Sequence, residues 1–319
     1  MTIKVIITKD FDHMSEIAAG IVKDKILQTL KDKKEFVFGL ATGNSPTGMY
    51  KNLAKMANSG EFDSSRIRSF NLDEYVGLPG ENAQQRALHP ESYSFFMIQE
   101  FFGLLNKKFI ETSVPFGCLI NQKKLMQELK ANPDDWSELG TDAGKSIAFK
   151  EKTTSEYLGW ICDDVLNAYI QKIEKVGGID LHIIGVGGRG HVAFHESGIP
   201  FEDSNVMLVK LDDNTIKNAV SDGHFSSEEE SPNYAISMGA ELVYKAKNIV
   251  LLANGERKTG PIGESLLNDP TPDVPISYGQ IYSEKGGNLI YVIDKHAGKE
   301  LLENKDILKQ KGIEIEVLE

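Results

Sequence analysis

Cysteine is scarce in this sequence: Cys118 and Cys162 are the only two in 319 residues. Because they lie far apart along the chain, neither a disulfide framework nor a cysteine-based metal cluster is indicated.

Long apolar runs are also missing. No stretch approaches the roughly 18 continuous apolar residues that a membrane-spanning helix needs, and the apolar run Ile3–Ile7 is too short for a signal peptide. We therefore expect a cytoplasmic protein with no membrane partner.

The chain has no excess of basic charge either. Its formal net charge is −12 and its pI is near 5.2, whereas nucleic-acid binders normally present a basic surface. We expect no nucleic-acid partner, although a local basic pocket for a small anion stays open. With 40% apolar and 26% charged residues, the composition is that of an ordinary globular protein.

What is present is an alternation of short apolar runs with segments of helical periodicity, which predicts an α/β fold. Strands are expected at residues 3–7, 35–40, 66–72, 181–186, 206–211, 248–252, 289–293 and 313–317, and helices at 14–30, 89–101, 157–176 and 234–243. No repeat or composition break divides the chain. We therefore expect one domain, 1–319, with the irregular residues 121–155 as a surface insertion.

The turn after the strand at 35–40 offers polar groups to a ligand. Ser45 is a good N-cap, with Pro46 at the first helical position. The hydroxyls of Thr42 and Ser45 and the N–H of Gly43 could hold a phosphate at this helix N-terminus. A capped turn without any ligand is the alternative.

Two adjacent carboxylates, Asp73 and Glu74, follow the strand at 66–72. Such a pair could supply a general base. An exposed acidic turn is the alternative, because successive strand residues point to opposite faces and need not cooperate.

A glycine-rich stretch, Gly185–Glu196, follows the strand at 181–186. Gly185, Gly187 and Gly190 match the dinucleotide-binding fingerprint, and Asp212 lies where a ribose-binding acid would be expected. Against this interpretation, Gly198 and Pro200 leave no room for the crossover helix that a βαβ unit requires.

The histidines of this stretch raise a second alternative. His191 and His195 have the i, i+4 spacing of a helical zinc pair, but the order is His-Val-Ala-Phe-His-Glu rather than His-Glu-x-x-His, and no third ligand is evident. A third interpretation is structural, with His191 and Glu196 hydrogen-bonded in a packed turn.

Several of these segments together resemble the glucosamine-6-phosphate deaminase family, and they occur in the family's order. They are Leu40–Pro46, Phe70–Leu78, His89–Tyr93, Gly185–Glu196, Tyr234–Gly239 and Gly255–Lys258. The block Asp-Glu-Tyr-Val-Gly-Leu at 73–78 is fairly specific to the family. The ending Gly-His-x-Ala-Phe-x-Glu favours deaminases over the related 6-phosphogluconolactonases.

The resemblance implies a modified Rossmann-like fold, with a mostly parallel sheet and helices on both faces. It also implies a reaction without metal or cofactor, in which an amino-sugar phosphate and water give a ketose phosphate and ammonia. Asp73 would be the base that moves a proton between C2 and C1, and His191 would assist ring opening with Glu196 orienting its imidazole.

Substrate contacts follow from the same resemblance. The residues that would hold the phosphate or nearby hydroxyls are Thr42, Gly43, Asn44, Ser45 and Gly187, with Lys258 supplying positive charge.

Two residues depart from the family pattern. Arg189 stands where most members have an aspartate of the ring-opening relay, and Ile216 stands where they have a phosphate-binding arginine. Arginine stays protonated and cannot act as a base. We hypothesise that Arg189 supplies the anion charge missing at Ile216.

The expected function is isomerising deamination of a hexosamine 6-phosphate. The alternatives are another sugar-phosphate isomerase, a lactonase-like hydrolase, or a sugar-phosphate sensor without catalysis. The expected partner is a small sugar phosphate, and assembly into a homo-oligomer stays open.

Overall fold

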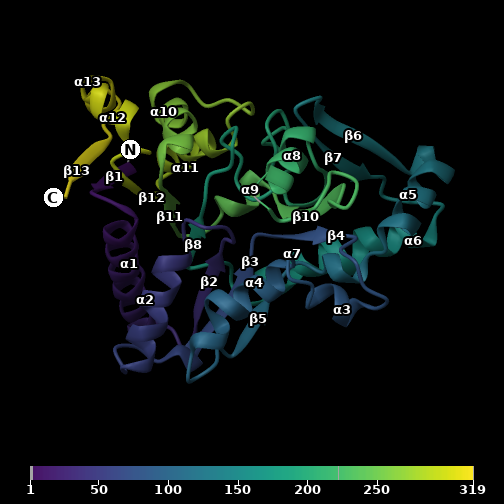
Figure 1. The fold of residues 1–319 in the computed structure, drawn as a ribbon, viewed down its shortest axis with the longest axis horizontal. Helices are drawn as coiled ribbons and strands as arrows, with labels where there is room; N and C mark the ends of the chain where they lie inside the picture. The colour runs from purple at the N-terminus through teal and green to yellow at the C-terminus, as the bar shows by residue number, and fades with distance from the viewer. Residues whose placement is uncertain (1–2, 222, 319) are drawn as a thin grey trace.

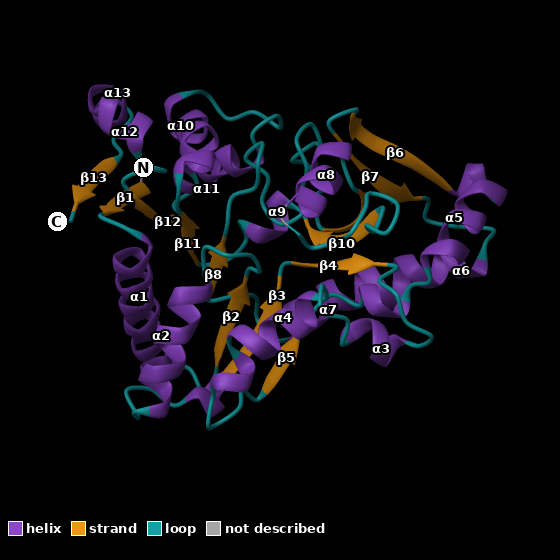
Figure 2. Cartoon of the chain, viewed as in Figure 1, coloured by secondary structure: helices purple, strands orange, loops and turns teal. Residues whose placement is uncertain are grey.

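In the computed structural model, residues 3–221 and 223–318 are described, and their strands form two sheets (Figures 1 and 2). The larger sheet has eight strands in the order β13-β1-β12-β11-β8-β2-β3-β5, and neighbouring strands are parallel. Its strands are β1 Ile3–Thr8, β2 Phe36–Leu40, β3 Ile67–Asn71, β5 Glu111–Ser113, β8 Leu181–Ile184, β11 Asn248–Ala253, β12 Asn288–Asp294 and β13 Glu314–Val317. The predicted α/β fold with a mostly parallel sheet is confirmed.

Helices cover both faces of this sheet. Helix α1, Phe11–Asp32, begins where Asp10 accepts a hydrogen bond from the His13 N–H. Consecutive residues of β12 show the two faces: Ile290 lies with Ile21 of α1 around a small cavity, whereas the Tyr291 hydroxyl is 3.2 Å from Ser265 Oγ of α10. A strand that is buried on both faces reads as a continuous apolar run, as these strands do in the sequence.

The remaining helices have these bounds: α2 Thr47–Asn58, α3 Ala83–Ala87, α4 Tyr93–Glu100, α5 Gln122–Ala131, α6 Glu156–Trp160, α7 Ala168–Lys175, α8 Asp213–Ser221, α9 Ala240–Val243, α10 Thr259–Leu267, α11 Tyr278–Glu284, α12 Lys299–Glu303 and α13 Lys305–Gln310. A π-helical segment, Ile161–Asn167, joins α6 to α7. No helix in residues 3–221 and 223–318 combines the length and apolar character that crossing a membrane requires.

The second sheet is antiparallel, with the order β4-β10-β9-β7-β6, and lies to the right of the first in Figure 1. Its strands are β4 Asp73–Val76, β6 Trp136–Thr141, β7 Gly144–Phe149, β9 Val206–Lys210 and β10 Tyr234–Met238. Leu72 joins the two sheets, because its N–H donates to Leu40 of β2 and its carbonyl accepts from Met238 of β10. The second sheet therefore begins at the carboxyl ends of β2 and β3.

Three local predictions need correction. The expected helix at 234–243 is strand β10 followed by the short helix α9. Ser45 does not cap α2: the helix begins at Thr47, and the Ser45 hydroxyl donates to Asn254 Oδ1 at 2.8 Å. Residues 121–155 are not irregular, since they form α5 and the hairpin β6–β7, whose second strand pairs with β9. That hairpin extends the second sheet by two strands.

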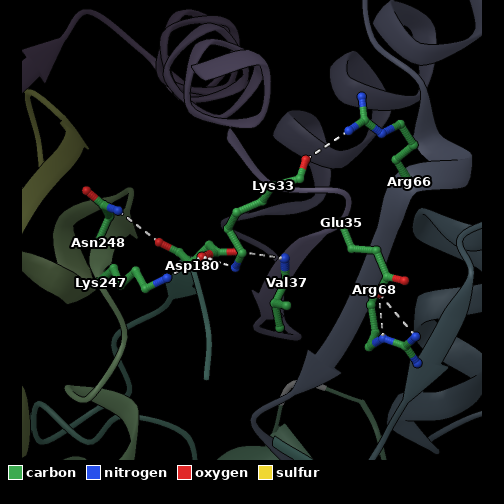
Figure 3. Close-up of polar contacts among 8 residues, drawn as sticks. All are labelled: Lys33, Glu35, Val37, Arg66, Arg68, Asp180, Lys247 and Asn248. Carbon is green, nitrogen blue, oxygen red and sulfur yellow. Dashed lines mark hydrogen bonds and ion pairs between the residues drawn. The ribbon is translucent and has the colours of Figure 1, made fainter. Parts of the chain in front are cut away.

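A polar cluster fixes the opposite, amino end of the parallel strands (Figure 3). Asp180, directly before β8, is buried and accepts hydrogen bonds from Lys33 Nζ at 2.7 Å, Lys247 Nζ at 2.9 Å and the Val37 N–H at 3.0 Å. Burial alone would raise the pKa of Asp180, but the hydrogen bonds from Lys33 and Lys247 bring the pKa below its ordinary value. This carboxylate ties the starts of β2, β8 and β11 together.

Candidate active site

A cavity of about 200 Å³ lies at the carboxyl ends of β2, β3 and β8. Thr42 and Gly43 line it from the turn after β2, Asp73 from β4, and Gly187 and His191 from the glycine-rich stretch. The sequence-predicted residues from three distant segments thus meet at one place. In open α/β sheets this edge is where ligands bind.

Aromatic rings form one wall of the cavity. Tyr93 and Phe194 stack with ring centroids 5.9 Å apart, and Tyr75 packs against both rings. Such faces suit the C–H surface of a sugar ring. Sequence reasoning did not assign this wall, although His89–Tyr93 and Gly185–Glu196 contain two of its members.

Asp73 is buried, with a residue exposure of 5%, and its Oδ1 has no hydrogen-bond partner in the described part of the chain. Burial, with a further contribution from the neighbouring Glu74 charge, raises the pKa of Asp73 well above its ordinary value. A raised pKa makes the ionised carboxylate a stronger base. Asp73 lines the cavity, and its carboxylate keeps hydrogen-bonding capacity that the described part of the chain does not use.

Glu74 has a different role from its neighbour. Its carboxylate accepts hydrogen bonds from the N–H groups of Tyr75, Tyr93 and Ser94 and from the Ser92 hydroxyl. Burial raises the pKa of Glu74, and these hydrogen bonds partly offset the rise. Glu74 therefore fixes the start of α4 against β4, and the alternative of an exposed acidic turn is wrong.

The dinucleotide interpretation of the glycine-rich stretch is also wrong. Residues 185–205 contain no helix, and the next strand, β9, belongs to the antiparallel sheet. A dinucleotide site needs a crossover helix between two parallel strands of one sheet.

His191, Glu196 and Thr215 form a hydrogen-bonded chain behind the cavity. Glu196 Oε2 lies 3.0 Å from His191 Nδ1, and Glu196 Oε1 accepts from Thr215 Oγ1 at 2.7 Å. The buried carboxylate favours the tautomer with the proton on Nδ1, which leaves Nε2 of a neutral ring as an acceptor. A Cβ at Gly187 would overlap the His191 ring, so this position requires glycine.

His195 is not a partner of His191 in a metal pair. Its Nδ1 accepts a hydrogen bond from the Ala240 N–H, and its Nε2 lies 3.0 Å from the Ile199 carbonyl. Burial lowers the pKa of His195 to about 4, which keeps the ring neutral. Both ring nitrogens are engaged with backbone groups, so the i, i+4 spacing of the two histidines has a structural origin.

Only some of the residues predicted to bind the anion line the cavity. Thr42 and Gly43 line the cavity, whereas Asn44 and Ser45 are not among its lining residues. Lys258 Nζ donates to the carbonyl of Val186 at 2.6 Å, and Val186 lines the cavity.

The two departures from the family pattern lie outside the lining. Arg189 is about half exposed, and its Nη1 is 4.0 Å from Asp212 Oδ2. Ile216, on α8, is buried in an apolar cluster with Tyr75 and Phe194. Thr215, one residue earlier on α8, reaches Glu196 instead.

Two further residues, Glu91 and His224, line the mouth of the cavity. Their side chains are 2.7 Å apart, between Glu91 Oε2 and His224 Nδ1. Local sequence patterns do not connect these two residues, because 133 residues separate them.

Comparison with known proteins places these observations in context. No protein-family model matches the sequence. A glucosamine-6-phosphate deaminase of Thermoanaerobacter sp. is 34% identical over 304 residues, covering 95% of this chain and 97% of the relative. A glucosamine-6-phosphate deaminase of Clostridium acetobutylicum is 32% identical over 298 residues, covering 93% of this chain and 100% of the relative.

Solved structures show the same architecture. A monomeric glucosamine-6-phosphate deaminase superposes with a TM-score of 0.68 at 25% identity, covering 93% of this chain and 99% of that one. A 6-phosphogluconolactonase from Trypanosoma brucei superposes with a TM-score of 0.59 at 14% identity, covering 93% and 98%. At that identity the second likeness concerns the fold alone.

Proposed function

This chain belongs to the glucosamine-6-phosphate deaminase family, and we propose that it is an enzyme that converts a hexosamine 6-phosphate and water into a ketose 6-phosphate and ammonia. The observation that carries the proposal is the placement of Asp73. Asp73 lines the same cavity as His191, and its buried carboxylate has one oxygen without a hydrogen-bond partner in the described part of the chain. An isomerising deaminase needs a base and a ring-opening group at one sugar.

In the proposed mechanism, His191 acts first. Its Nε2 exchanges a proton between the hydroxyl on C1 and the ring oxygen, which opens the pyranose, while Glu196 stabilises the charged imidazole through Nδ1. The Asp73 carboxylate then removes the C2 proton of the open-chain sugar and delivers it to C1, while one proton passes from the C2 ammonium group to the aldehyde oxygen O1. The resulting imine at C2 is hydrolysed by water, which releases ammonia and leaves the ketose phosphate.

Phosphate binding is proposed for the turn after β2. The Thr42 hydroxyl and the Gly43 N–H would contact the phosphate, with Lys258 close behind Val186. For Asn44 and Ser45 to contribute, Ser45 must exchange its hydrogen bond with Asn254 for the ligand. Gly187 would allow close backbone approach of the sugar.

The role of Arg189 is a separate proposal. To supply the charge missing at Ile216, its guanidinium would have to leave Asp212 for the ligand. We further propose a single cytoplasmic domain, 1–319, that uses neither metal nor cofactor, because side chains supply each proton transfer above. Self-assembly into a homo-oligomer stays open in this proposal.

The direct test is ammonia release from glucosamine 6-phosphate and its epimers. The variants are Asp73→Asn, Arg189→Asp and, as a control, Asp306→Asn, which changes an exposed residue of α13. We expect Asp73→Asn to lose at least about 100-fold in kcat, Arg189→Asp to raise KM, and the control to match the wild type. Full activity of Asp73→Asn would disprove the assigned base, and an unchanged KM in Arg189→Asp would disprove the compensation.

The same samples separate the alternatives. Lactone hydrolysis or isomerisation without ammonia release would favour the other enzymes of this fold. Thermal stabilisation by the sugar phosphate without any turnover would favour a sensor.

A further inference from the structure

The tip of the hairpin β6–β7 packs directly against Glu196. A Cβ at Gly144 would overlap the Cβ of Glu196 and lie 2.8 Å from the carbonyl oxygen of Ser197. In the other direction, a Cβ at Gly198, where φ is +85°, would overlap the Thr141 side chain. The two segments therefore touch at the level of the backbone from both sides.

The opposite side of the Glu196 segment is also held. Ser197 Oγ donates to the Asp273 carbonyl at 2.6 Å, and the Gly198 N–H donates to the Pro272 carbonyl at 2.9 Å. The backbone that carries Glu196 is thus enclosed between the hairpin and residues 272–273. Its carboxylate can then meet both His191 and Thr215 without searching other orientations.

The hairpin also belongs to the sheet that carries Asp73. Strand β7 pairs with β9, β9 with β10, and β10 with β4, where Ser237 is the register partner of Asp73. The Ser237 hydroxyl accepts the Phe194 N–H at 2.9 Å, two residues before Glu196. One sheet therefore holds Asp73 directly and supports the Glu196 segment at two points.

We propose that the hairpin β6–β7 is a positioning element for the His191–Glu196 pair, with Gly144 as its critical residue. The kinetic part of this inference rests on the proposed function, since it concerns the ring-opening step. Gly144 does not have a positive φ, so alanine is acceptable to its backbone and only space opposes the substitution. Gly144→Ala therefore forces the backbone at Glu196 and Ser197 to move relative to the hairpin tip.

The test compares Gly144→Ala with Gly20→Ala, a control because nothing lies within 4 Å of a Cβ at Gly20. We expect Gly144→Ala to lower kcat about 10-fold with KM within about twofold, since a small misplacement of a catalytic group slows chemistry more than binding. If the hairpin had a purely structural role, Gly144→Ala would lower the melting temperature and leave kcat per folded molecule unchanged.

A second readout does not depend on activity. Long-range ¹H–¹⁵N spectra, assigned with His191→Gln, report the ring tautomer. We expect the Nδ1-protonated form in the wild type and a mixture of tautomers in Gly144→Ala. If the wild type releases no ammonia, the proposed function fails while the spectra still test the hairpin.

Thr141→Ala is a milder variant in case Gly144→Ala does not fold. It removes the contact with Gly198, and we expect a smaller change of kcat and tautomer in the same direction. The inference would be overturned if a folded Gly144→Ala protein had the wild-type tautomer and the wild-type kcat. If only Thr141→Ala folds, the same two results in that variant would overturn it.

Discussion

Asp73 carries a charge that its surroundings in the folded chain disfavour. Because burial raises the pKa of Asp73, the protonated form is preferred in the folded state. The stability that this preference contributes is present below the ordinary pKa of aspartate and is lost as the pH rises through the raised pKa. Ionising Asp73 so that it can act as a base therefore costs stability, as is common in active sites.

Asp73→Asn should consequently be more stable than the wild type at pH 7 while inactive. The amide cannot ionise, so we expect the free energy of unfolding to rise at pH 7. Near pH 4 the gain should shrink. Denaturant titrations at both pH values measure it, and an Asp73→Asn protein less stable than the wild type at pH 7 would contradict the argument.

Thr215 is the residue at which α8 contacts the catalytic pair. Its hydroxyl donates to Glu196 Oε1 at 2.7 Å, and this carboxylate is buried. Thr215→Val keeps the shape and removes the donor, so we expect kcat to fall roughly 10- to 150-fold, the range of a lost hydrogen bond to a charged group. Thr215→Ser keeps the hydroxyl and should restore most of kcat. Equal kcat values for the valine and serine variants would show that the hydrogen bond has no part in orienting Glu196.

At the scale of elements, sequence patterns identified seven of the eight parallel strands, missed the short strand β5 and misassigned β10. Runs such as Leu181–Ile184 are buried on both faces, so they read as strands from composition alone. Residues 234–238 are also entirely buried, but Gly239 and helix α9 follow at once, and the combined segment has an apolar pattern that helices share. Local periodicity cannot separate these cases, because the partner strands β4 and β9 decide the conformation.

The clusters at the two ends of the parallel strands serve different purposes. Asp180, at the amino ends, has hydrogen bonds to both of its oxygens, whereas Asp73, at the carboxyl ends, keeps one oxygen unpaired. The first arrangement stabilises the sheet and the second is available to a ligand. The sequence motifs pointed only to Asp73, because the partners of Asp180 are distant in the chain.

Asp180→Ala should therefore destabilise the fold without changing the chemistry. The substitution leaves the Val37 N–H without its buried acceptor and removes the carboxylate that pairs with two lysines. We therefore expect the free energy of unfolding to fall by about 2 kcal/mol. The remaining lysines reach solvent, which limits the loss. Urea denaturation gives the value, with Lys23→Ala as an exposed ion-pair control expected to change stability by less than about 1 kcal/mol. A fall in kcat at full folding would contradict the purely structural role.

At the scale of the whole molecule, the site forms where two sheets meet. The motifs at 42–45, 73–74 and 185–196 could be predicted from the sequence because each is a short local pattern of turn and polar residues. The hairpin tip at Gly144, Thr215, and the Glu91–His224 pair could not, because their roles arise only when the second sheet and α8 pack against the glycine-rich stretch. Long-range packing leaves no local periodic signal.

Two buried histidines should control the stability of the whole chain in acid. Burial lowers the pKa values of His182 and His195 to about 4, below their ordinary 6.5. Between these pH values the unfolded chain binds more protons than the folded chain, so stability falls as the pH falls. Each histidine should contribute a loss of about 3 kcal/mol between pH 6.5 and pH 4.

Asp73 and Glu74 change the stability in the opposite direction: because burial raises their pKa values, their contribution to stability grows as the pH falls. The prediction is therefore tested as a difference, by measuring the unfolding free energy of the wild type and of His195→Gln from pH 7 to pH 4. At pH 7 the variant should be less stable, because glutamine cannot reproduce both hydrogen bonds of the ring. The difference in unfolding free energy should shrink as the pH falls. In acid, only the wild type takes up a proton at residue 195 when unfolding exposes the imidazole. A gap that stays constant across this range would show that His195 titrates alike in the folded and unfolded chains.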